Sequence, residues 1–185
     1  MQVDEQVFLD LAEDAAKIVF LDLEATGLKG DYNSILVFSL KPYGKKSYSF
    51  TVGQPGNDLR VCREAKEALE SYNCWVGYYS KGYDIPMLNT RLLKWGMRPV
   101  EKQPHLDMYF TLKANLLTAR RSQAHLLEWL ETPQQKMTIS AETWNRVLSD
   151  FGPTINTLRK RCESDVAGLE SLYKKTRHVI REIKK

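Results

Sequence analysis

Residues 17–30 read KIVFLDLEATGLKG, and this stretch decides the fold. The run IVFL at 18–21 is apolar and rich in β-favouring residues, which predicts a strand buried on both faces. Asp22 and Glu24 follow in that strand, where residues two apart share a face, roughly 6.6 Å apart along it. Adjacent carboxylates in a sheet interior repel one another, and a divalent cation such as Mg²⁺ or Mn²⁺ removes that cost. The alternative, an exposed edge strand with solvated acids, is disfavoured by the apolar run before the pair.

Length and composition describe a globular chain. The 185 residues, 43% hydrophobic and 27% charged, fit one domain over residues 1–185 with a sizeable core. No apolar run is long enough to span a membrane, and the acidic N-terminus lacks the basic region of a signal peptide. Cys62, Cys74 and Cys162 form no C-x-x-C pair, so reduced thiols and a cytoplasmic location are expected. The net charge of +4 permits an anionic partner, although solvated Lys and Arg side chains give the same figure.

Hydrophobic patterning and turn residues divide the chain into a strand-rich first part and a strand–helix remainder. A meander of three antiparallel strands is expected over residues 17–52. Short strands are expected at residues 74–79 and 105–108, and helices at 59–72, 85–95, 122–131, 141–150 and 154–183. Asp58 is a candidate cap for the first of these helices, and residues 2–16 predict an acidic amphipathic lead-in. The pattern describes one mixed α/β layered domain.

A further acid, Asp84, stands where a buried strand gives way to a helix. The segment CWVGYYSKGYDIP places it two residues before Pro86, which is tolerated in the first turn of a helix. A carboxylate here could simply cap the helix by accepting a backbone N–H, worth about 1 kcal/mol. The other interpretation is a site residue at a loop–helix junction.

Asp165 lies on the core-facing side of the last predicted helix. The apolar stripe of that helix runs through positions 158, 162, 166, 169 and 172, at spacings of three and four. An ionised carboxylate on this side needs a partner, either a metal ion or a buried Arg or Lys.

Together these stretches resemble the motifs of the DEDD-type (DnaQ-like) 3′–5′ exonucleases, a family with a ribonuclease H-like fold. DLEATGL at 22–28 resembles the first motif, D-x-E-T-T-G-L, and GYYSKGYDIPML at 77–88 resembles the second, G-H-N-x-x-x-F-D-x-P-x-L. CESDV at 162–166 resembles the third motif, and HLDM at 105–108 a family strand whose acid, here Asp107, stays outside the metal core. The resemblance covers residues 17–175. It implies a mixed sheet, with an antiparallel meander first and parallel strands after it, flanked by helices.

The resemblance also implies roles for the four acids. Asp22 would bridge two divalent ions, Mg²⁺ or Mn²⁺, with Glu24 and Asp165 on the first ion. Asp84 would support the second. Such a pair of ions clamps the attacking and leaving oxygens of a phosphodiester.

Other residues are expected to contact the substrate. Thr26 and Leu28 match family positions that seat the terminal nucleotide. Tyr79 and Tyr83 are candidates for stacking on bases, with core packing as the alternative for Tyr83.

Two departures from the family pattern lie beside the predicted site. Tyr78 and Tyr79 stand where the second motif has His and Asn. Arg161 and Lys160 stand where a Tyr or a His would act as general base, and neither side chain gives up a proton readily at neutral pH. Arg161 is expected to grip the scissile or adjacent phosphate. The alternative is an ion pair with Glu163 or another surface acid, worth at most about 1 kcal/mol.

Two classes of function follow. The first is a metal-dependent 3′–5′ exonuclease acting on single-stranded or frayed nucleic acid with a 3′ end, DNA ahead of RNA, with no membrane contact. Partners in replication or repair are not visible in the sequence. The second class is a non-catalytic or weakly active nucleic-acid-binding scaffold of the same fold. The four acids favour the enzyme, whereas Arg161 and Tyr79 favour the scaffold.

Overall fold

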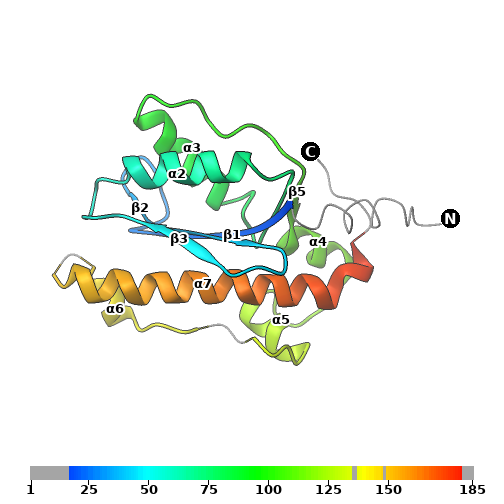
Figure 1. Ribbon diagram of the computed structural model, residues 1–185. Helices are drawn as coiled ribbons and strands as arrows, with labels where there is room; N and C mark the ends of the chain where they lie inside the picture. The colour runs from blue at the N-terminus through cyan, green and yellow to red at the C-terminus, as the bar shows by residue number, and fades with distance from the viewer. Residues whose placement is uncertain (1–16, 135–136, 148, 181–185) are drawn as a thin grey trace.

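A five-stranded mixed sheet lies between two layers of helices in the computed structural model (Figure 1). The structure describes residues 17–134, 137–147 and 149–180. The strands are β1 (Ile18–Ala25), β2 (Ile35–Pro42), β3 (Tyr48–Thr51), β4 (Cys74–Gly77) and β5 (His105–Asp107). Their order is β3-β2-β1-β4-β5, in which β1–β2 and β2–β3 pair antiparallel and β1–β4 and β4–β5 pair parallel. The predicted α/β architecture, a meander followed by parallel strands, is confirmed.

Strand β1 is the centre of this sheet. It pairs with β2 on one side and β4 on the other, and every residue in it except Asp22 is buried. The edge-strand alternative is therefore wrong. A strand covered on both faces explains why its sequence is a continuous apolar run rather than an alternation of apolar and polar residues.

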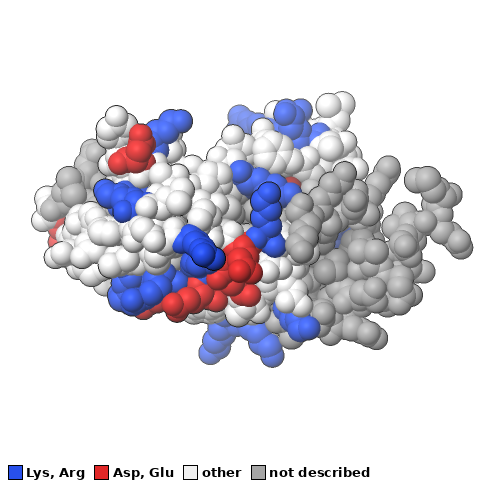
Figure 2. Space-filling model, turned by 90° about the horizontal axis from the view of Figure 1, so that it is seen from above, with Lys and Arg blue, Asp and Glu red and all other residues white. Residues whose placement is uncertain are grey.

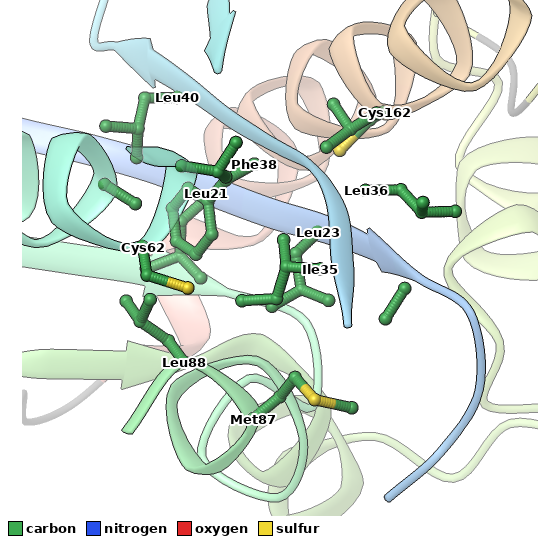
Figure 3. Close-up of a cluster of buried hydrophobic side chains, with 14 of the residues drawn as sticks. Leu21, Leu23, Ile35, Leu36, Phe38, Leu40, Cys62, Met87, Leu88 and Cys162 are labelled. Carbon is green, nitrogen blue, oxygen red and sulfur yellow. The ribbon is translucent and has the colours of Figure 1, made fainter. Parts of the chain in front are cut away.

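Helices α2 (Leu59–Glu70) and α3 (Asp84–Lys94) cover one face of the sheet (Figure 1). Figure 3 shows Met87 and Leu88 of α3 next to the sheet residues Leu21, Leu23 and Ile35. All five side chains are almost fully buried, at roughly 1.5–3 kcal/mol of transfer free energy for each. This core fixes the start of α3 against β1, which matters because α3 begins with Asp84.

The opposite face is covered by the long helix α7 (Phe151–Thr176), with α5 (Gln123–Trp129) and α6 (Ala141–Asn145) beyond it (Figure 1). Ile18 and Phe20 of β1 pack in one cluster with Val166 and Leu169 of α7. The apolar stripe predicted for the last helix therefore does face the sheet. The helix ends at Thr176, where a 3-10 turn (Arg177–Val179) follows.

Several expected elements differ in extent. Helix α2 stops at Glu70, β4 stops at Gly77, α6 ends at Asn145, and α7 begins at Phe151 rather than residue 154. Helix α4 (Met108–Asn115) was not predicted, because its sequence MYFTLKAN has no clear apolar stripe. The lead-in predicted at residues 2–16 and the last residues of the tail helix predicted to run to 183 lie outside the described residues.

Asp58 does not cap α2 with its side chain, which corrects the prediction. Both of its oxygens accept hydrogen bonds from Arg91 of α3, at 2.8 and 2.9 Å, and one also accepts the indole N–H of Trp95. Its Oδ2 accepts the backbone N–H of Ile35 as well, at 2.8 Å. These donors hold the pKa of Asp58 below its usual value, although burial opposes them. The carboxylate joins α2, α3 and β2 in the interior.

None of the helices within residues 17–134, 137–147 and 149–180 combines the length and apolar character needed to cross a membrane. All three cysteines, Cys62, Cys74 and Cys162, are free and buried. Over α2 and α3, the Lys and Arg side chains of the described residues are interspersed with acidic ones (Figure 2).

Candidate active site

Asp22 and Glu24 lie on the face of β1 that is directed toward α7. Phe20 of the same strand packs with Val166 of α7, and alternation along the strand gives Asp22 and Glu24 the same direction. Cys162 of α7 meets Asp22 directly, because its Sγ donates to Asp22 Oδ2 at 3.2 Å and lies 3.3 Å from the carbonyl oxygen. Burial and the adjacent carboxylates Asp22 and Glu24 raise the pKa of Cys162 well above its usual value, so this thiol keeps its proton. Asp22 is therefore fixed by both the strand and the helix.

Helix α7 brings a third carboxylate to this point. Asp165 is buried on the same side of the helix as Cys162 and Leu169, as the apolar stripe predicted. One oxygen from each of Asp22, Glu24 and Asp165 lies within 4.8 Å of the other two. An all-oxygen donor set of this size is the kind that Mg²⁺ and Mn²⁺ prefer.

Asp84 enters from the other face, at the first residue of α3. Its Oδ1 accepts the backbone N–H of Leu23 in β1 at 3.0 Å. The residue at the N-cap position is Tyr83, and no side chain caps the helix, so the capping interpretation of Asp84 is wrong. Burial, followed by the charge of nearby Asp22, raises the pKa of Asp84 well above its usual value. The protein thus holds Asp84 against β1 next to another carboxylate.

Arg161 points into this group of acids. Its guanidinium pairs with Glu24 Oε1 through Nη1, while Nη2 lies 4.0 Å from Asp165 Oδ2. The guanidinium carbon also lies 5.9 Å from the centre of the Trp144 ring, within the range of a cation–π contact.

Glu163 is not the partner of Arg161. It pairs instead with Arg159 at 3.0 Å and accepts a hydrogen bond from Ser49 at 2.8 Å. The expected alternative of a surface ion pair with Glu163 is therefore wrong. Arg161 meets the buried Glu24, 137 positions away in the sequence.

The loop after β1 closes on itself. The backbone N–H of Thr26 donates to the carbonyl of Ser34 at 3.0 Å, and Thr26 Oγ1 accepts the N–H of Ser34 at 3.1 Å. Gly27 is required here, since a Cβ at this position would come within 2.5 Å of Asn33. Leu28 then projects outward, with 79% of its surface exposed.

Tyr83, just before α3, and Arg91 of α3 fasten this loop to the helix. The hydroxyl of Tyr83 donates to the carbonyl of Gly27 at 3.0 Å, and Arg91 donates to the carbonyl of Gly30 at 3.0 Å. Burial and the charges of Asp84, Glu24 and Asp22 raise the pKa of Tyr83 to about 12. Tyr83 is therefore a permanent donor that positions the loop.

A pocket of about 490 Å³ opens over the acids. Among the predicted site residues, those that line it are Asp22, Glu24, Thr26, Leu28, Tyr83, Asp84, Arg161 and Asp165. Tyr79 is not in the lining, whereas Tyr78 and Trp144 are. Trp144 had no signal beyond its place in a predicted helix. Its position depends on α6 packing beside α7, which a single sequence does not reveal.

A family model of the RNase H superfamily matches residues 19–177, and the chain belongs to this superfamily. The resemblance of its three motifs to the DEDD-type exonucleases is in keeping with that membership. A search of curated protein sequences finds no match.

Solved structures with the same fold include enzymes that act on nucleic acids. The family B DNA polymerase of Pyrobaculum calidifontis matches with a TM-score of 0.67 and 17% identity, over 86% of this chain and 24% of the polymerase. A structure described as the apo form of a nuclease matches with a TM-score of 0.62 and 19% identity, over 92% of this chain and 78% of the nuclease. NrnC of Brucella melitensis, bound to pGG, matches with a TM-score of 0.55 and 16% identity, over 91% of this chain and 77% of NrnC. This chain therefore spans about a quarter of the polymerase, and at these identities the likeness concerns the fold.

Proposed function

We propose that this chain is a metal-dependent 3′–5′ exonuclease, with residues 1–185 as one catalytic domain. It hydrolyses phosphodiester bonds at the 3′ end of single-stranded or frayed nucleic acid, DNA ahead of RNA. The observation that carries the proposal is the convergence of Asp22, Glu24 and Asp165, with one oxygen of each within 4.8 Å of the others, in a pocket that Asp84 also lines.

The acids of the pocket fit hard divalent cations. Asp22, Glu24 and Asp165 would hold one ion, and Asp22 with Asp84 would hold a second. Ions of this kind, when bound, lower the pKa of water and stabilise the negative charge on a departing oxygen. Mg²⁺ and Mn²⁺ are the expected ions, since all of these ligand atoms are carboxylate oxygens.

The remaining side chains position the end of the strand. Thr26 and the loop that it closes present backbone groups at the pocket wall, and the exposed Leu28 can pack against the last base. Tyr83 keeps that loop in place through Gly27. Arg161 donates hydrogen bonds and stays protonated, so it acts as a phosphate ligand rather than as the base.

The names of the structural neighbours support a nucleic-acid substrate. One is a family B DNA polymerase, one is called a nuclease, and one is bound to pGG. The preference for DNA remains part of the proposal, and it is tested by comparing DNA and RNA of one sequence.

A labelled single strand tests the proposal. A 5′-fluorescein oligonucleotide is expected to give a ladder of shortened products with Mg²⁺ or Mn²⁺ and to stay intact with EDTA. An inverted nucleotide at its 3′ end should block the reaction. Labelled fragments of random size that also form from the oligonucleotide with the blocked 3′ end would identify an endonuclease and overturn the stated direction.

Asp22→Asn provides the matched variant. It should lower the rate by at least about 10³-fold, because the metal contribution is several kcal/mol. Glu67→Gln changes an exposed acid of α2 outside the pocket lining and should leave the rate unchanged. Equal cleavage by wild type and Asp22→Asn would mean that another nuclease is responsible.

A second candidate, a nucleic-acid-binding scaffold without efficient chemistry, is favoured by one observation. Arg161 stands at the position expected for the general base and pairs with Glu24 inside the group of acids. A scaffold would bind oligonucleotides equally well with EDTA and with Mn²⁺ and would leave them uncut.

A further inference from the structure

Four aromatic rings form a cluster at the edge of the pocket. They are Tyr78 and Tyr79, which follow β4, and Tyr109 and Phe110 of α4, and we call them the aromatic platform. The ring of Tyr79 lies 5.2 Å from that of Tyr109 and 5.6 Å from that of Phe110, and Tyr78 lies 6.0 Å from Tyr109. Tyr78 also lines the pocket, so the platform is continuous with the site described above. Figure 1 shows α4 beside the end of β5, the strand that pairs in parallel with β4.

A single buried carboxylate fixes both halves of the platform. Asp107 accepts the backbone N–H groups of Tyr79 at 3.0 Å and Lys81 at 2.8 Å on one side. On the other side it accepts the N–H of Tyr109 at 3.1 Å, at the start of α4. This explains what Asp107 does outside the metal site. Its acceptor capacity goes to positioning the two segments that carry the rings.

Tyr79 is held in a backbone conformation that side chains rarely adopt. Its φ is +61°, in the left-handed region that costs a non-glycine residue about 1–2 kcal/mol. The carbonyl of Tyr79 accepts the N–H groups of Gly82 and Tyr83, at 2.9 and 3.0 Å, which closes a tight turn. The ring lies over Gly82, where a Cβ would come within 2.6 Å of it. The hydrogen bonds of the turn therefore hold Tyr79 at this unfavourable φ and keep its ring in place.

Two rings of the platform remain open to solvent. Tyr79 is 46% exposed and Phe110 is 45% exposed. Rings that served only as core would be covered, and a rigid exposed group of them marks a surface for binding.

The exposed charges next to the platform are positive. Lys81 lies within the turn that begins at Tyr79, and Lys113 follows Tyr109 by one helical turn on α4. The hydroxyl of Tyr78 donates to the carbonyl of Arg121, which places the exposed Arg121 at the other side. Flat apolar faces among cations complement the bases and phosphates of an unpaired strand.

We propose that the aromatic platform stacks the unpaired bases that precede the nucleotide in the pocket. The ligand is therefore single-stranded nucleic acid longer than the pocket itself, bound with little preference for base identity. This proposal rests on the proposed exonuclease function and adds a binding surface for the strand next to the acidic pocket. Paired duplex is excluded from this surface, because its bases already stack on one another.

Binding of a 5′-fluorescein oligo-dT 12-mer is measured by fluorescence anisotropy. Ca²⁺ replaces Mg²⁺ so that cleavage is suppressed. Tyr79→Asn removes the ring but tolerates a positive φ, and it restores the residue of the motif described above. Phe110→Ala removes the second exposed ring. Each change should weaken binding of the 12-mer about ten-fold or more. Trp129→Ala removes an exposed aromatic of α5 outside the platform and should have no effect.

An abasic scan locates the stacked base. Removing one base a few nucleotides from the 3′ end should weaken binding to the wild type at one or two positions. The same oligonucleotides should bind Tyr79→Asn with no further loss, because the ring that read the base is gone. A scan that gives the same profile for both proteins would overturn the stacking proposal.

A small substrate separates this proposal from the proposed function. The p-nitrophenyl ester of thymidine 5′-phosphate reaches only the pocket, so its kcat/KM should be unchanged in Phe110→Ala, because Phe110 does not line the pocket. If neither this ester nor the oligonucleotides are cut, the exonuclease proposal fails, and anisotropy still tests the platform. If both are cut and the platform variants bind and cut the 12-mer like wild type, the platform proposal alone fails. If the platform variants change the oligomeric state, measured by light scattering, but not the affinity for the 12-mer, the surface makes protein contacts. That result would also overturn the platform proposal.

Discussion

Two acidic regions of the protein, Asp58 with Arg91 and the four acids that line the pocket with Arg161, differ in how the protein neutralises their charge. Asp58 is met by the guanidinium of Arg91 through two hydrogen bonds, and by two N–H donors besides. In the pocket, Arg161 is the one cationic side chain among the described lining residues, and it faces the carboxylates of Asp22, Glu24, Asp84 and Asp165.

The difference separates a carboxylate that fastens elements together from carboxylates that converge on a pocket. Around Asp58 the charges balance and the donors come from α3, β2 and Trp95, so the pair fastens elements together. In the pocket, one oxygen from each of Asp22, Glu24 and Asp165 lies within 4.8 Å of the others, and burial, followed by the charge of Asp22, raises the pKa of Asp84. A carboxylate beside an arginine is thus weak evidence for a site, and several carboxylates that converge in a pocket are better evidence.

The largest expected effect comes from breaking the balanced pair. Asp58→Ala leaves Arg91 buried without its counterion and should lower the free energy of unfolding by about 3–5 kcal/mol. The measurement is urea unfolding followed by circular dichroism. Glu64→Gln breaks the exposed Arg60–Glu64 pair and should cost less than about 1 kcal/mol. Equal costs for the two variants would remove the structural role that the comparison gives to Asp58.

His105 sharpens the comparison through pH. It is buried against Ser80 at 2.8 Å, and burial, with the charge of Lys81 adding to it, lowers its pKa from 6.5 to about 4. The unfolded chain therefore binds more protons in this window, and stability falls as pH drops from 6.5 toward 4. The loss at pH 5 should be about 2 kcal/mol.

The Asp58 pair behaves differently in acid. The pKa of Asp58 is lowered in the fold, so its contribution persists down to its unfolded pKa and is lost only as pH falls through the folded value. His105→Gln should accordingly flatten the pH dependence of stability between 7 and 5, while Glu64→Gln should not. A decline that survives in His105→Gln would place the titrating group elsewhere.

The sequence predicted the strand and the acids because both are local. The apolar run before Asp22 gave β1, and helical spacing put Asp165 on the inner side of α7. Asp58 was misread as a helix cap, since its real partner is Arg91, 33 positions away. The pairing of Arg161 with Glu24 joins residues 137 apart and carries no local pattern either. A single sequence does not reveal pairs of residues that come together only through tertiary packing.

Helix α4 shows a different reason for failure. Its residues Tyr109, Phe110 and Leu112 are apolar around most of the helix, so no stripe marks an inner face. Two of these residues serve the platform rather than the core, and function has overridden the usual pattern.

A smaller effect is expected when one acid of the pocket is replaced by a neutral residue. Asp84→Asn keeps an acceptor for the N–H of Leu23 and removes one buried charge. Stability in EDTA should rise by about 1 kcal/mol, measured by urea unfolding, while nuclease activity falls. A loss of stability in EDTA would show that Asp84 belongs with Asp58 as a structural group.

The smallest effect concerns Arg161, and it separates two roles in one residue. Its pairing with Glu24 places a protein cation where a metal ion would sit, so binding of a divalent ion must displace or redirect the guanidinium. Arg161→Gln should therefore bind Mn²⁺ roughly three- to ten-fold more tightly by calorimetry, if the pair between the partly buried Arg161 and the buried Glu24 is worth about 1 kcal/mol. Arg159→Gln, which removes a neighbouring arginine paired with Glu163, is the control and should leave Mn²⁺ affinity unchanged.

Once released, the guanidinium is free to meet a phosphate, so Arg161→Gln should weaken oligonucleotide binding while it strengthens metal binding. Opposite signs for the two ligands are the signature of an arginine that moves between the acids and the substrate. Arg161→Tyr provides a third measurement, the cleavage rate at saturating metal. The rate should rise, because the variant restores the phenol expected at the position of the general base. If Arg161→Gln and Arg161→Tyr both match the wild type in metal affinity, substrate affinity and rate, Arg161 has no part in the reaction.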